Sequence, residues 1–375
     1  MRTKAAVEAE LSWPQVHAFR LRGHDLDATP HGSVVQVAAD IGGAQAQVMS
    51  AAELQLAVRS GRPVTEVRDA LWTDRKLVKT WLMRGTLHLV RAEDLPIYTA
   101  AMSGSWMRWR GSWLKYFGVS AKELNQLVAT ISGALNGEPK TREEIIAVAG
   151  KGQPARVRQY LKSGWGGFLK PVARAGGLCF GPSRGQSVTF VRPSDWLSSW
   201  RELDPEAALA EIARRYLRAF GPATKQDFAT WWGRWPGVAN AAWNGLDGEL
   251  TTVSVEGLVA QVLTSDMKRF PSGAGATVHL LPAFDPYLMG YVSRDHLFDR
   301  AHRPKVSRIA GWISPVLLVD GVVAGTWSHV AAGKTLRVEV EPFARLAPKT
   351  RTAAAHRAES IAKSLGLAKA ELRVA

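Results

Sequence analysis

Residues 206–263 begin with EAALAEIARRYLRAFG (206–221) and continue through GPATKQDFATWWG (221–233) and VANAAWNGLDG (238–248) into ELTTVSVEGLVAQVL (249–263). The first three segments have a helical pattern with glycines between them, whereas the last alternates as two short strands. Thr224 and Asp227 predict a helix start, because a threonine cap followed by an acidic third residue forms a capping box. Helix, turn, helix and strand pair is the order of a winged helix-turn-helix domain, whose hairpin is the wing.

The same order of elements occurs twice more, nearer the N-terminus. The first copy runs from SAAELQLAVRSG (50–61) through TDRKLVKTWLMRG (73–85) into TLHLV (86–90), and the second runs from TREEIIAVAG (141–150) to the hairpin LCFGPSRGQSVTFVR (178–192). Ser50 with Glu53, and Thr141 with Glu144, are further capping-box pairs. The copies are irregularly spaced, which indicates tandem domains and not a solenoid. Unrelated small α+β domains in a row would give the same rhythm, and we predict winged helices.

The chain after residue 270 changes to short alternating apolar stretches. Asp320 and Gly321 within VLLVDGVVAGTW (316–327) predict a hairpin turn, and TAAAHRAESIAKSLGL (352–367) predicts a final helix. We therefore predict an α+β fold in four parts. These are an N-terminal helix with the first winged helix (1–100), a second winged helix (101–200), a third (201–270) and a β-rich C-terminal region (271–375).

The composition predicts a polyanionic partner. Lys and Arg number 48 against 33 Asp and Glu, which gives a net charge of +15 and a pI near 10.1. Basic chains of this kind bind nucleic acid, although a generally basic proteome would give the same signal. The N-terminus has no apolar signal segment and no run of 18 apolar residues occurs, so the sequence predicts a cytoplasmic protein without a membrane partner.

The motifs of several enzyme classes are absent. Cys179 is the single cysteine, so it cannot form an intramolecular disulfide, and its apolar neighbours predict a buried side chain. None of the nine histidines stands at a metal-ligand spacing, and His88 is expected to be a hydrogen-bonded residue of a wing strand. No phosphate-binding loop and no nucleophile elbow occurs. An enzyme with this sequence is predicted to use no metal and no cofactor.

The tripeptide Gln45-Ala46-Gln47 follows a Gly42-Gly43 break and leads into the helix expected at about residue 50. If the chain is extended there, the two glutamine side chains project to the same side, whereas on a helix they diverge. Taken alone, the pattern is more typical of a solvated loop than of a functional site. Its setting makes Gln45 and Gln47 the candidate functional pair.

Basic side chains at two places are candidates for contact with a phosphate backbone. Lys225 lies near the start of the helix expected at 225–232, and RDHLFDRAHRPKVSR (294–308) contains Arg300, Arg303, Lys305 and Arg308. The second segment fits a solvated loop on a basic protein as well. The adjacent Trp231 and Trp232 are expected in the core, because neighbouring helix positions rarely both face a ligand.

Five blocks, in order along the chain, resemble the AlkZ/YcaQ-type DNA glycosylases. They are GGAQAQVMSAAELQLAVR (42–59), WLMRGTLHLVRAEDLP (81–96), GPATKQDFATWWG (221–233), LLPAFDPYLMGY (280–291) and VLLVDGVVAGTW (316–327). The resemblance extends from about residue 10 to about residue 370. It implies a C-shaped molecule of tandem winged helices that wraps double-stranded DNA.

The resemblance also implies the chemistry. The active site of that family carries Gln-x-Gln or Gln-x-Asp, which falls here on Gln45 and Gln47 and matches the AlkZ-like branch. The implied reaction is removal of a bulky N7-alkylguanine, or unhooking of an interstrand crosslink, as self-resistance to a DNA-alkylating natural product. The motif contains no lysine nucleophile, so we expect a monofunctional hydrolase, and tandem modules on one chain need no dimer.

Two further features are less determined by the sequence. Asp285 in the fourth block either orients a water or a catalytic glutamine, or is a buried residue that caps a turn. The hairpin around Asp320 is a candidate wedge for entering the duplex. A non-catalytic winged-helix regulator and a protein that sequesters the toxin are the rival functions, and the first of them also fits the charge and the repeat.

Overall fold

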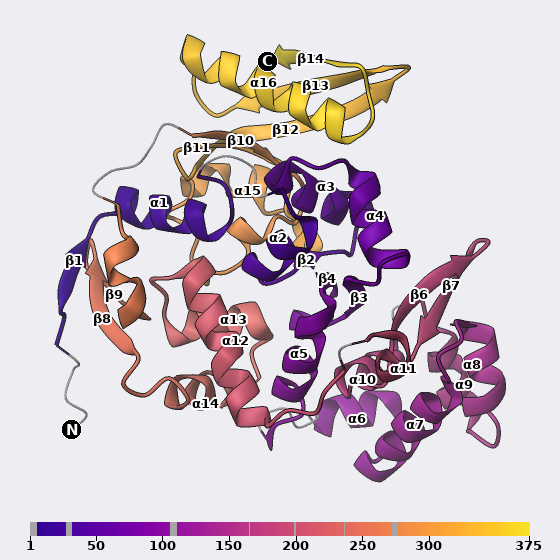
Figure 1. The fold of residues 1–375 in the computed structure, drawn as a ribbon. Coiled ribbons are helices and arrows are strands. Elements are labelled where there is room, and N and C mark those ends of the chain that lie inside the picture. Colours follow the sequence, from indigo (N-terminus) through magenta and orange to yellow (C-terminus); the bar gives the residue numbers. More distant parts are fainter. Residues whose placement is uncertain are drawn as a thin grey trace.

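A computed structural model describes residues 6–27, 32–105, 111–164, 166–198, 200–235, 237–271 and 277–375 of the chain. The described residues form a mixed α+β fold, as predicted (Figure 1). Within these ranges, no helix is long and apolar enough to cross a bilayer.

Residues 205–263 form the third unit, which contains the helices and strands expected from its sequence. Its elements are α12 (Pro205–Phe220), α13 (Lys225–Trp232), α14 (Val238–Asn244), β8 (Leu250–Val255) and β9 (Leu258–Leu263). Thr224 and Asp227 form the predicted capping box at the start of α13. Between α12 and α13, Ala223 makes an antiparallel bridge with Gln261 of β9. The unit therefore has a short extended segment between its first two helices, paired with the last strand.

The same element order builds two other units. The first unit (34–91) contains α2 (Val34–Asp40), β2 (Ala44–Gln45), α3 (Met49–Ser60), α4 (Val64–Trp72), β3 (Leu77–Trp81) and β4 (Leu87–Arg91). The second unit (121–191) contains α7 (Ala121–Ala134), β5 (Lys140–Thr141), α8 (Arg142–Ala149), α9 (Ala155–Lys162), α10 (Leu169–Arg174), β6 (Cys179–Arg184) and β7 (Ser187–Val191). Their sheets have the orders β2-β4-β3 and β5-β7-β6, so in each unit the short strand pairs with the last strand.

One of the two upstream capping boxes is present and the other is not. Thr141 and Glu144 cap α8 reciprocally, as predicted. The prediction for Ser50 is wrong, because α3 begins one residue earlier, after Val48, and has no side-chain cap. Glu53 instead accepts two hydrogen bonds of 2.8 Å from Arg68. Since no side chain caps α3, its first-turn N–H groups keep their capacity to donate.

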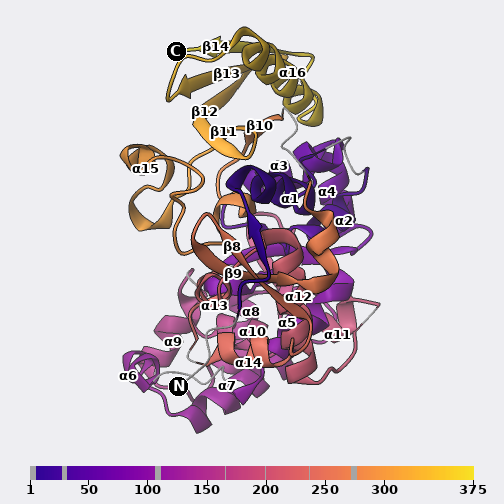
Figure 2. The same cartoon turned by 90° about the vertical axis from the view of Figure 1, so that its left-hand side faces the viewer.

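The C-terminal region is a five-stranded sheet covered by one helix. Strands β10 (Val278–Leu281), β11 (Val316–Val319), β12 (Val322–Ala332), β13 (Thr335–Pro342) and β14 (Lys369–Val374) lie in that order, and α16 (Pro348–Ser364) packs on them. Two views place this layer at one end of the molecule (Figure 1, Figure 2). Asp320 and Gly321 connect β11 to β12 with φ of 51° and 81°, which confirms the hairpin. Strand β14 was not predicted.

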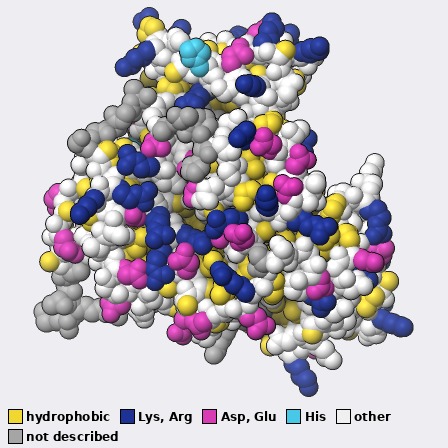
Figure 3. Space-filling model, in the orientation of Figure 1, with side chains coloured by type: hydrophobic (Ala, Val, Ile, Leu, Met, Phe, Trp, Pro, Cys, Tyr) yellow, Lys and Arg dark blue, Asp and Glu magenta, His cyan; other side chains and the backbone are white. Residues whose placement is uncertain are grey.

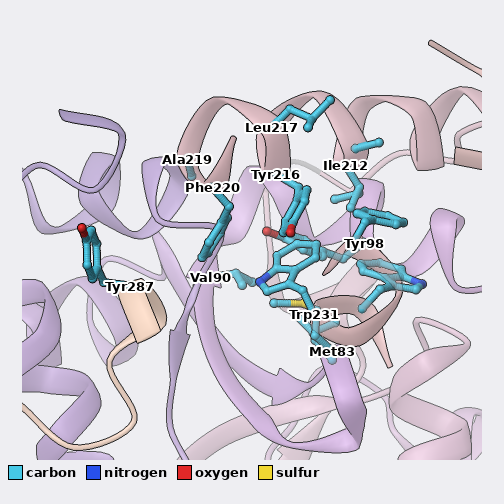
Figure 4. Close-up of a cluster of buried hydrophobic side chains, with 14 of the residues drawn as sticks. Met83, Val90, Tyr98, Ile212, Tyr216, Leu217, Ala219, Phe220, Trp231 and Tyr287 are labelled. Atoms are coloured by element: carbon cyan, nitrogen blue, oxygen red, sulfur yellow. The ribbon is translucent and has the colours of Figure 1, made fainter. Parts of the chain in front are cut away.

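A shared hydrophobic core joins the units and the C-terminal region. Helix α5 (Leu95–Ala101) follows the first unit and packs against α12 of the third. Figure 4 shows side chains from both units turned toward one another, among them Met83, Val90, Tyr98, Tyr216 and Trp231. Near the N-terminus, β1 (Ala9–Leu11) pairs in parallel with β8, and α1 (Trp13–Gly23) follows it. The first and third units are therefore held in contact.

Candidate active site

The backbone at Gln45 and Gln47 is extended and not helical, which is the alternative in which both side chains project to the same side. Ala44 and Gln45 pair with Leu89 and His88 of β4, and Ala46 N–H donates to the Leu87 carbonyl at 2.7 Å. Ala44 and Ala46 are both buried in the core of the first unit. Since side chains alternate along an extended chain, Gln45 and Gln47 are directed away from that core.

The two glutamines differ in exposure. Gln45 is 5% exposed, whereas Gln47 is exposed and precedes the uncapped start of α3. Gln47 makes no side-chain hydrogen bond to any residue in the described ranges. One glutamine is therefore held by the protein, and the other is free to meet solvent or a ligand.

Arg84 holds Gln45. It lies in the tight turn between β3 and β4 with a φ of 58°, inside a short 3₁₀ helix (Met83–Gly85). Its Nη2 donates to Oε1 of Gln45 at 3.0 Å, and its Nη1 donates to the carbonyl oxygen of Trp231 in α13 at 2.6 Å. The guanidinium thus connects the β3–β4 turn of the first unit to a helix of the third.

The Arg84 contact determines the orientation of the Gln45 amide. A guanidinium can only donate hydrogen bonds, so the atom of Gln45 that faces it must be the carbonyl oxygen. The amide NH2 of Gln45 is then the end left for other partners, and no residue in the described ranges bonds to it. A hydrogen bond on the oxygen also polarises the amide and makes its NH2 a stronger donor.

His88 completes this network as a neutral residue. Its Nδ1 lies 3.0 Å from the carbonyl oxygen of Thr86 and its Nε2 lies 3.3 Å from Arg84 Nη2. The carbonyl requires a proton on Nδ1, so Nε2 is the acceptor that faces Arg84. Burial, and then the Arg84 charge, lower the pKa of His88 to about 3. The expectation that His88 is a hydrogen-bonded residue of a strand is confirmed.

The charge of Arg84 is not balanced by a carboxylate among its described partners. Burial, followed by repulsion from Arg294, lowers the pKa of Arg84 to about 10, which still leaves it charged at neutral pH. Arg294 is the first residue of the basic segment at 294–308 and donates to Ser307, so the positive region around Arg84 continues into that segment. A buried unbalanced cation favours a nearby anion, and DNA phosphates are anions.

Asp285 is a buried residue that caps a turn. Its carboxylate forms a two-pronged ion pair with Arg59 of α3, with distances of 2.7 and 2.9 Å, and accepts from the N–H of Tyr287 at 3.0 Å. Both side chains of the pair are 0% exposed. Within the described ranges, no hydrogen bond connects Asp285 to Gln45 or Gln47. The carboxylate ties the C-terminal region to the helix that follows the glutamine pair.

The candidate phosphate contacts lie in two places. Lys225 is the first residue of α13, about 9 Å along the helix from Trp231, the residue that binds Arg84. Arg300, Arg303 and Lys305 lie on two consecutive short helical turns, Arg308 is extended just before a third, and all four are exposed. Arg300 is paired with Asp295 at 2.7 Å. Figure 3 shows lysine and arginine side chains grouped near the middle of one face.

The turn at Asp320, the candidate wedge, is packed against the protein on its Gly321 side. Asp320 accepts from Thr277 N–H at 2.6 Å, and the Gly321 carbonyl accepts from the Tyr287 hydroxyl at 3.0 Å. A Cβ at Gly321 would lie 2.6 Å from the Cβ of His17. Gly321 is therefore packed against the protein, whereas Val322, the next residue of the tip, is 39% exposed.

Other expectations about individual side chains are met. Trp231 and Trp232 are 3% and 1% exposed and lie in the core, and Cys179 is fully buried. Arg84 was not predicted, because its role depends on the pairing of β2 with β4. The one available signal was its place in the turn beside Gly85.

Comparisons with known proteins show the family to which the chain belongs. A family model described as DNA glycosylase AlkZ-like matches residues 38–364. An interstrand DNA cross-link repair glycosylase of Streptomyces sahachiroi is 36% identical over 378 residues, which cover 97% of this chain and 99% of the relative. The solved structure of Streptomyces sahachiroi DNA glycosylase AlkZ matches with a TM-score of 0.87 and 34% identity, covering 98% of this chain and 100% of that one. The chain therefore belongs to the AlkZ-like DNA glycosylase family.

Proposed function

We propose that this protein is a monofunctional DNA glycosylase that hydrolyses the N-glycosidic bond of bulky N7-alkylguanine in double-stranded DNA. The observation that carries the proposal is the pair Gln45 and Gln47, one fixed by Arg84 and one exposed, beside a buried positive charge. We include unhooking of interstrand crosslinks, in line with the name of the Streptomyces sahachiroi relative. Base excision repair in self-resistance to an alkylating natural product is the biological role we propose.

Neutral amides suffice for this substrate because alkylation activates the leaving group. N7-alkylguanine carries a positive charge, so the electron pair of the breaking C1′–N9 bond neutralises the departing base. No carboxylic acid is needed to protonate it, unlike the leaving groups of most glycosidases. Water supplies the new bond to C1′ and loses its proton to solvent, which leaves an abasic site. The protein has to position that water and stabilise the sugar cation.

The geometry suggests different tasks for the two glutamines. The NH2 of Gln45 points away from Arg84, so it suits an acceptor, such as a phosphate oxygen next to the lesion. The side chain of Gln47 is exposed and has a carbonyl oxygen that suits the attacking water. The uncapped N-terminus of α3 lies directly after Gln47 and offers N–H groups to a phosphate.

We propose that the three units are winged helix-turn-helix domains, within the boundaries 1–100, 101–200 and 201–270, that curve around the duplex with the region 271–375. The repeated order of helix, short strand, two helices and hairpin supports this proposal. Lys225, Arg300, Arg303, Lys305 and Arg308 are the proposed phosphate contacts. A monomer is sufficient for such an arrangement.

The basic segment also offers a replacement for the wedge. Ser307 and Ile313 form an antiparallel bridge, and between them Ile309 is 95% exposed and Trp312 is 40% exposed. Large apolar side chains beside arginines are what proteins insert between base steps. We propose this loop for the wedge role in place of the turn at Asp320.

The test is incubation of the purified protein with a duplex that carries a defined N7-alkylguanine, followed by heating in base. Strand cleavage at the lesion, dependent on the heating step, is the expected result. A winged-helix regulator would bind a particular sequence without cleavage. A sequestering protein would bind the free alkylating agent in the absence of DNA. Cleavage before heating would contradict a monofunctional hydrolase.

A further inference from the structure

A cavity of about 350 Å³ is built by the segment that connects β10 to β11. Three arginines line it, Arg294, Arg300 and Arg303, together with the apolar side chains of Val292 and Phe298. Guanidinium groups bind anions through charge-assisted hydrogen bonds, and their planar fork matches a carboxylate or a phosphate. The wall therefore fits an anion that is attached to an apolar group.

Arg294 has hydrogen-bond donors that the protein does not use. It is half-buried, whereas Arg300 and Arg303 are exposed. A guanidinium has five N–H donors, and within the described ranges only the Ser307 hydroxyl accepts from that of Arg294, at 3.2 Å. The Nε of Arg294 is buried without a partner. An anion at this guanidinium would supply further acceptors and balance its charge.

The carboxylate in the cavity wall is already engaged. Asp295 is the one acidic residue among the described lining residues, and its Oδ2 accepts from Nε and Nη2 of Arg300 at 3.0 and 2.7 Å. The side chain of Arg303 makes no hydrogen bond or ion pair with any residue in the described ranges. One carboxylate thus stands against three guanidinium groups, so the cavity retains a net positive charge.

Helix α13 places the cavity near the glutamine pair. Val292, in the cavity wall, donates its N–H to Asp227 Oδ1 at 2.8 Å. Arg84, which holds the first glutamine, donates to the Trp231 carbonyl at 2.6 Å. Asp227 and Trp231 are one turn apart on α13, about 6 Å along the helix. After burial, repulsion from Arg294 is the next cause of the lowered pKa of Arg84, which agrees with this proximity. A strand that meets the glutamines therefore passes within reach of the cavity.

We propose that Arg294 and Arg303 bind one backbone phosphate of the DNA close to the lesion, with the adjoining deoxyribose against Val292. The inference rests on the proposed function, which supplies DNA as the partner. A backbone phosphate combines the anion that the guanidinium groups recognise with a sugar whose C–H groups suit Val292, which is 56% exposed. Phosphate contacts fix the register of a protein on DNA, so Arg294 is a positioning residue for the glutamine pair.

The test is a scan with methylphosphonate, which replaces one charged phosphate oxygen by a methyl group at a single position. The fluorescein-labelled duplex carries N7-alkylguanine with a 2′-fluoro group on its sugar, because the fluorine destabilises the sugar cation and keeps the base attached during the titration. Fluorescence anisotropy with the full-length protein gives the affinity for each position near the lesion. The wild type is expected to lose about tenfold or more at one position, since a hydrogen bond to a charged group contributes on that scale.

Variants assign that position to the cavity. Arg294→Met and Arg303→Met are each expected to bind the unmodified duplex more weakly and to reduce the methylphosphonate effect at that one position to about threefold or less. Arg294→Lys retains the charge and should keep a larger effect than Arg294→Met. Arg345→Met removes an exposed charge in the loop after β13 and is the matched control, which should keep the full effect.

Two results would overturn the proposal. They are a wild type that is insensitive at every position, and a methylphosphonate effect that is undiminished in both methionine variants. Base release from the same duplexes without the 2′-fluoro group separates this proposal from the proposed function. Release with an undiminished effect rejects the Arg294 contact alone, whereas a diminished effect without release rejects the glycosylase.

Discussion

Arg84 Nη2 donates to Oε1 of Gln45 across 3.0 Å, and this contact determines which end of the amide is available for chemistry. The donor belongs to the turn between β3 and β4, whereas the acceptor lies on β2. The same guanidinium also binds the Trp231 carbonyl in α13, so two units position one glutamine. The arrangement gives Arg84 a positioning role.

Replacement of Arg84 is expected to reduce activity without loss of stability. Arg84→Met removes a buried charge that has no carboxylate among its described partners, and the relief of its desolvation offsets the lost hydrogen bonds to Gln45 and Trp231. We expect the single-turnover rate of base release to fall at least tenfold, with the thermal midpoint unchanged or higher. The pKa of His88, followed by NMR, should rise because one cause of its depression is removed. A lower midpoint with normal turnover would contradict the assignment.

Breaking the Arg59–Asp285 ion pair is expected to lower stability without lowering the rate of base release. Arg59→Met leaves a fully buried carboxylate without its partner, and such a loss costs about 3–5 kcal/mol of unfolding free energy. Urea titration measures this difference. Below the unfolding transition, the single-turnover rate per folded molecule should match the wild type. A rate loss without a stability loss would instead give Asp285 a role in catalysis.

Stability is expected to fall as the pH falls, because five histidines, four of them buried and one half-buried, are neutral in the fold. The pKa is lowered to about 4 for His17, about 3 for His88 and His279 and about 2 for His296, and well below 6.5 for His24, with burial as the largest cause. The unfolded chain binds more protons than the fold between about pH 6.5 and 4, so this stabilisation is complete above pH 6.5 and declines below it.

The measurement is urea denaturation at pH 7, 6 and 5. Each fully neutral histidine adds about 1.4 kcal/mol per pH unit to the slope at the acidic end of this range. A free energy of unfolding that is constant from pH 7 to 5 would show that these histidines are charged in the fold.

The proposed phosphate contacts should appear in the salt dependence of DNA binding. Arg303→Gln, Lys305→Gln and Arg308→Gln are each expected to reduce the slope of log K against log salt by about 1, with similar weakening on any sequence. Lys363→Gln on α16 is a control at a distance from this segment. Unchanged slopes in all three variants would place the DNA elsewhere.

Local sequence signals predicted most of the helices, strands and turns. The features that the sequence did not predict depend on contacts between residues far apart in the chain. Thr224, Thr141 and the Asp320–Gly321 turn were predictable because capping and turn chemistry act over a few residues. The Ser50 cap failed because Glu53 has a stronger partner in Arg68, on the next helix. Strand β14 was missed because its sequence alternates only weakly between apolar and polar residues. Its position depends on parallel pairing with β13.

In the candidate site, too, local features were predicted and long-range contacts were not. The glutamine pair was visible in the sequence, and its extended backbone confirmed one of two alternatives. Arg84 gains its role from a contact with Trp231, which is 147 residues away, and Asp285 is tied to Arg59 across 226 residues. No rule based on sequence spacing predicts contacts between residues so far apart in the chain. The residues that hold a site in place are therefore harder to predict than those of a short motif.

The most direct test of the account is the single-turnover rate of base release from an N7-alkylguanine duplex by Gln45→Ala and Gln47→Ala. Each variant is expected to lose on the order of a hundredfold or more, the range typical when a group that positions or activates a reactant is removed. Gln126→Ala, an exposed glutamine on α7, should match the wild type. Gln45→Glu retains an acceptor for Arg84 but lacks the NH2, so it should be as slow as Gln45→Ala. Wild-type rates in both alanine variants, with thermal midpoints unchanged, would contradict the assignment of Gln45 and Gln47 as the catalytic pair.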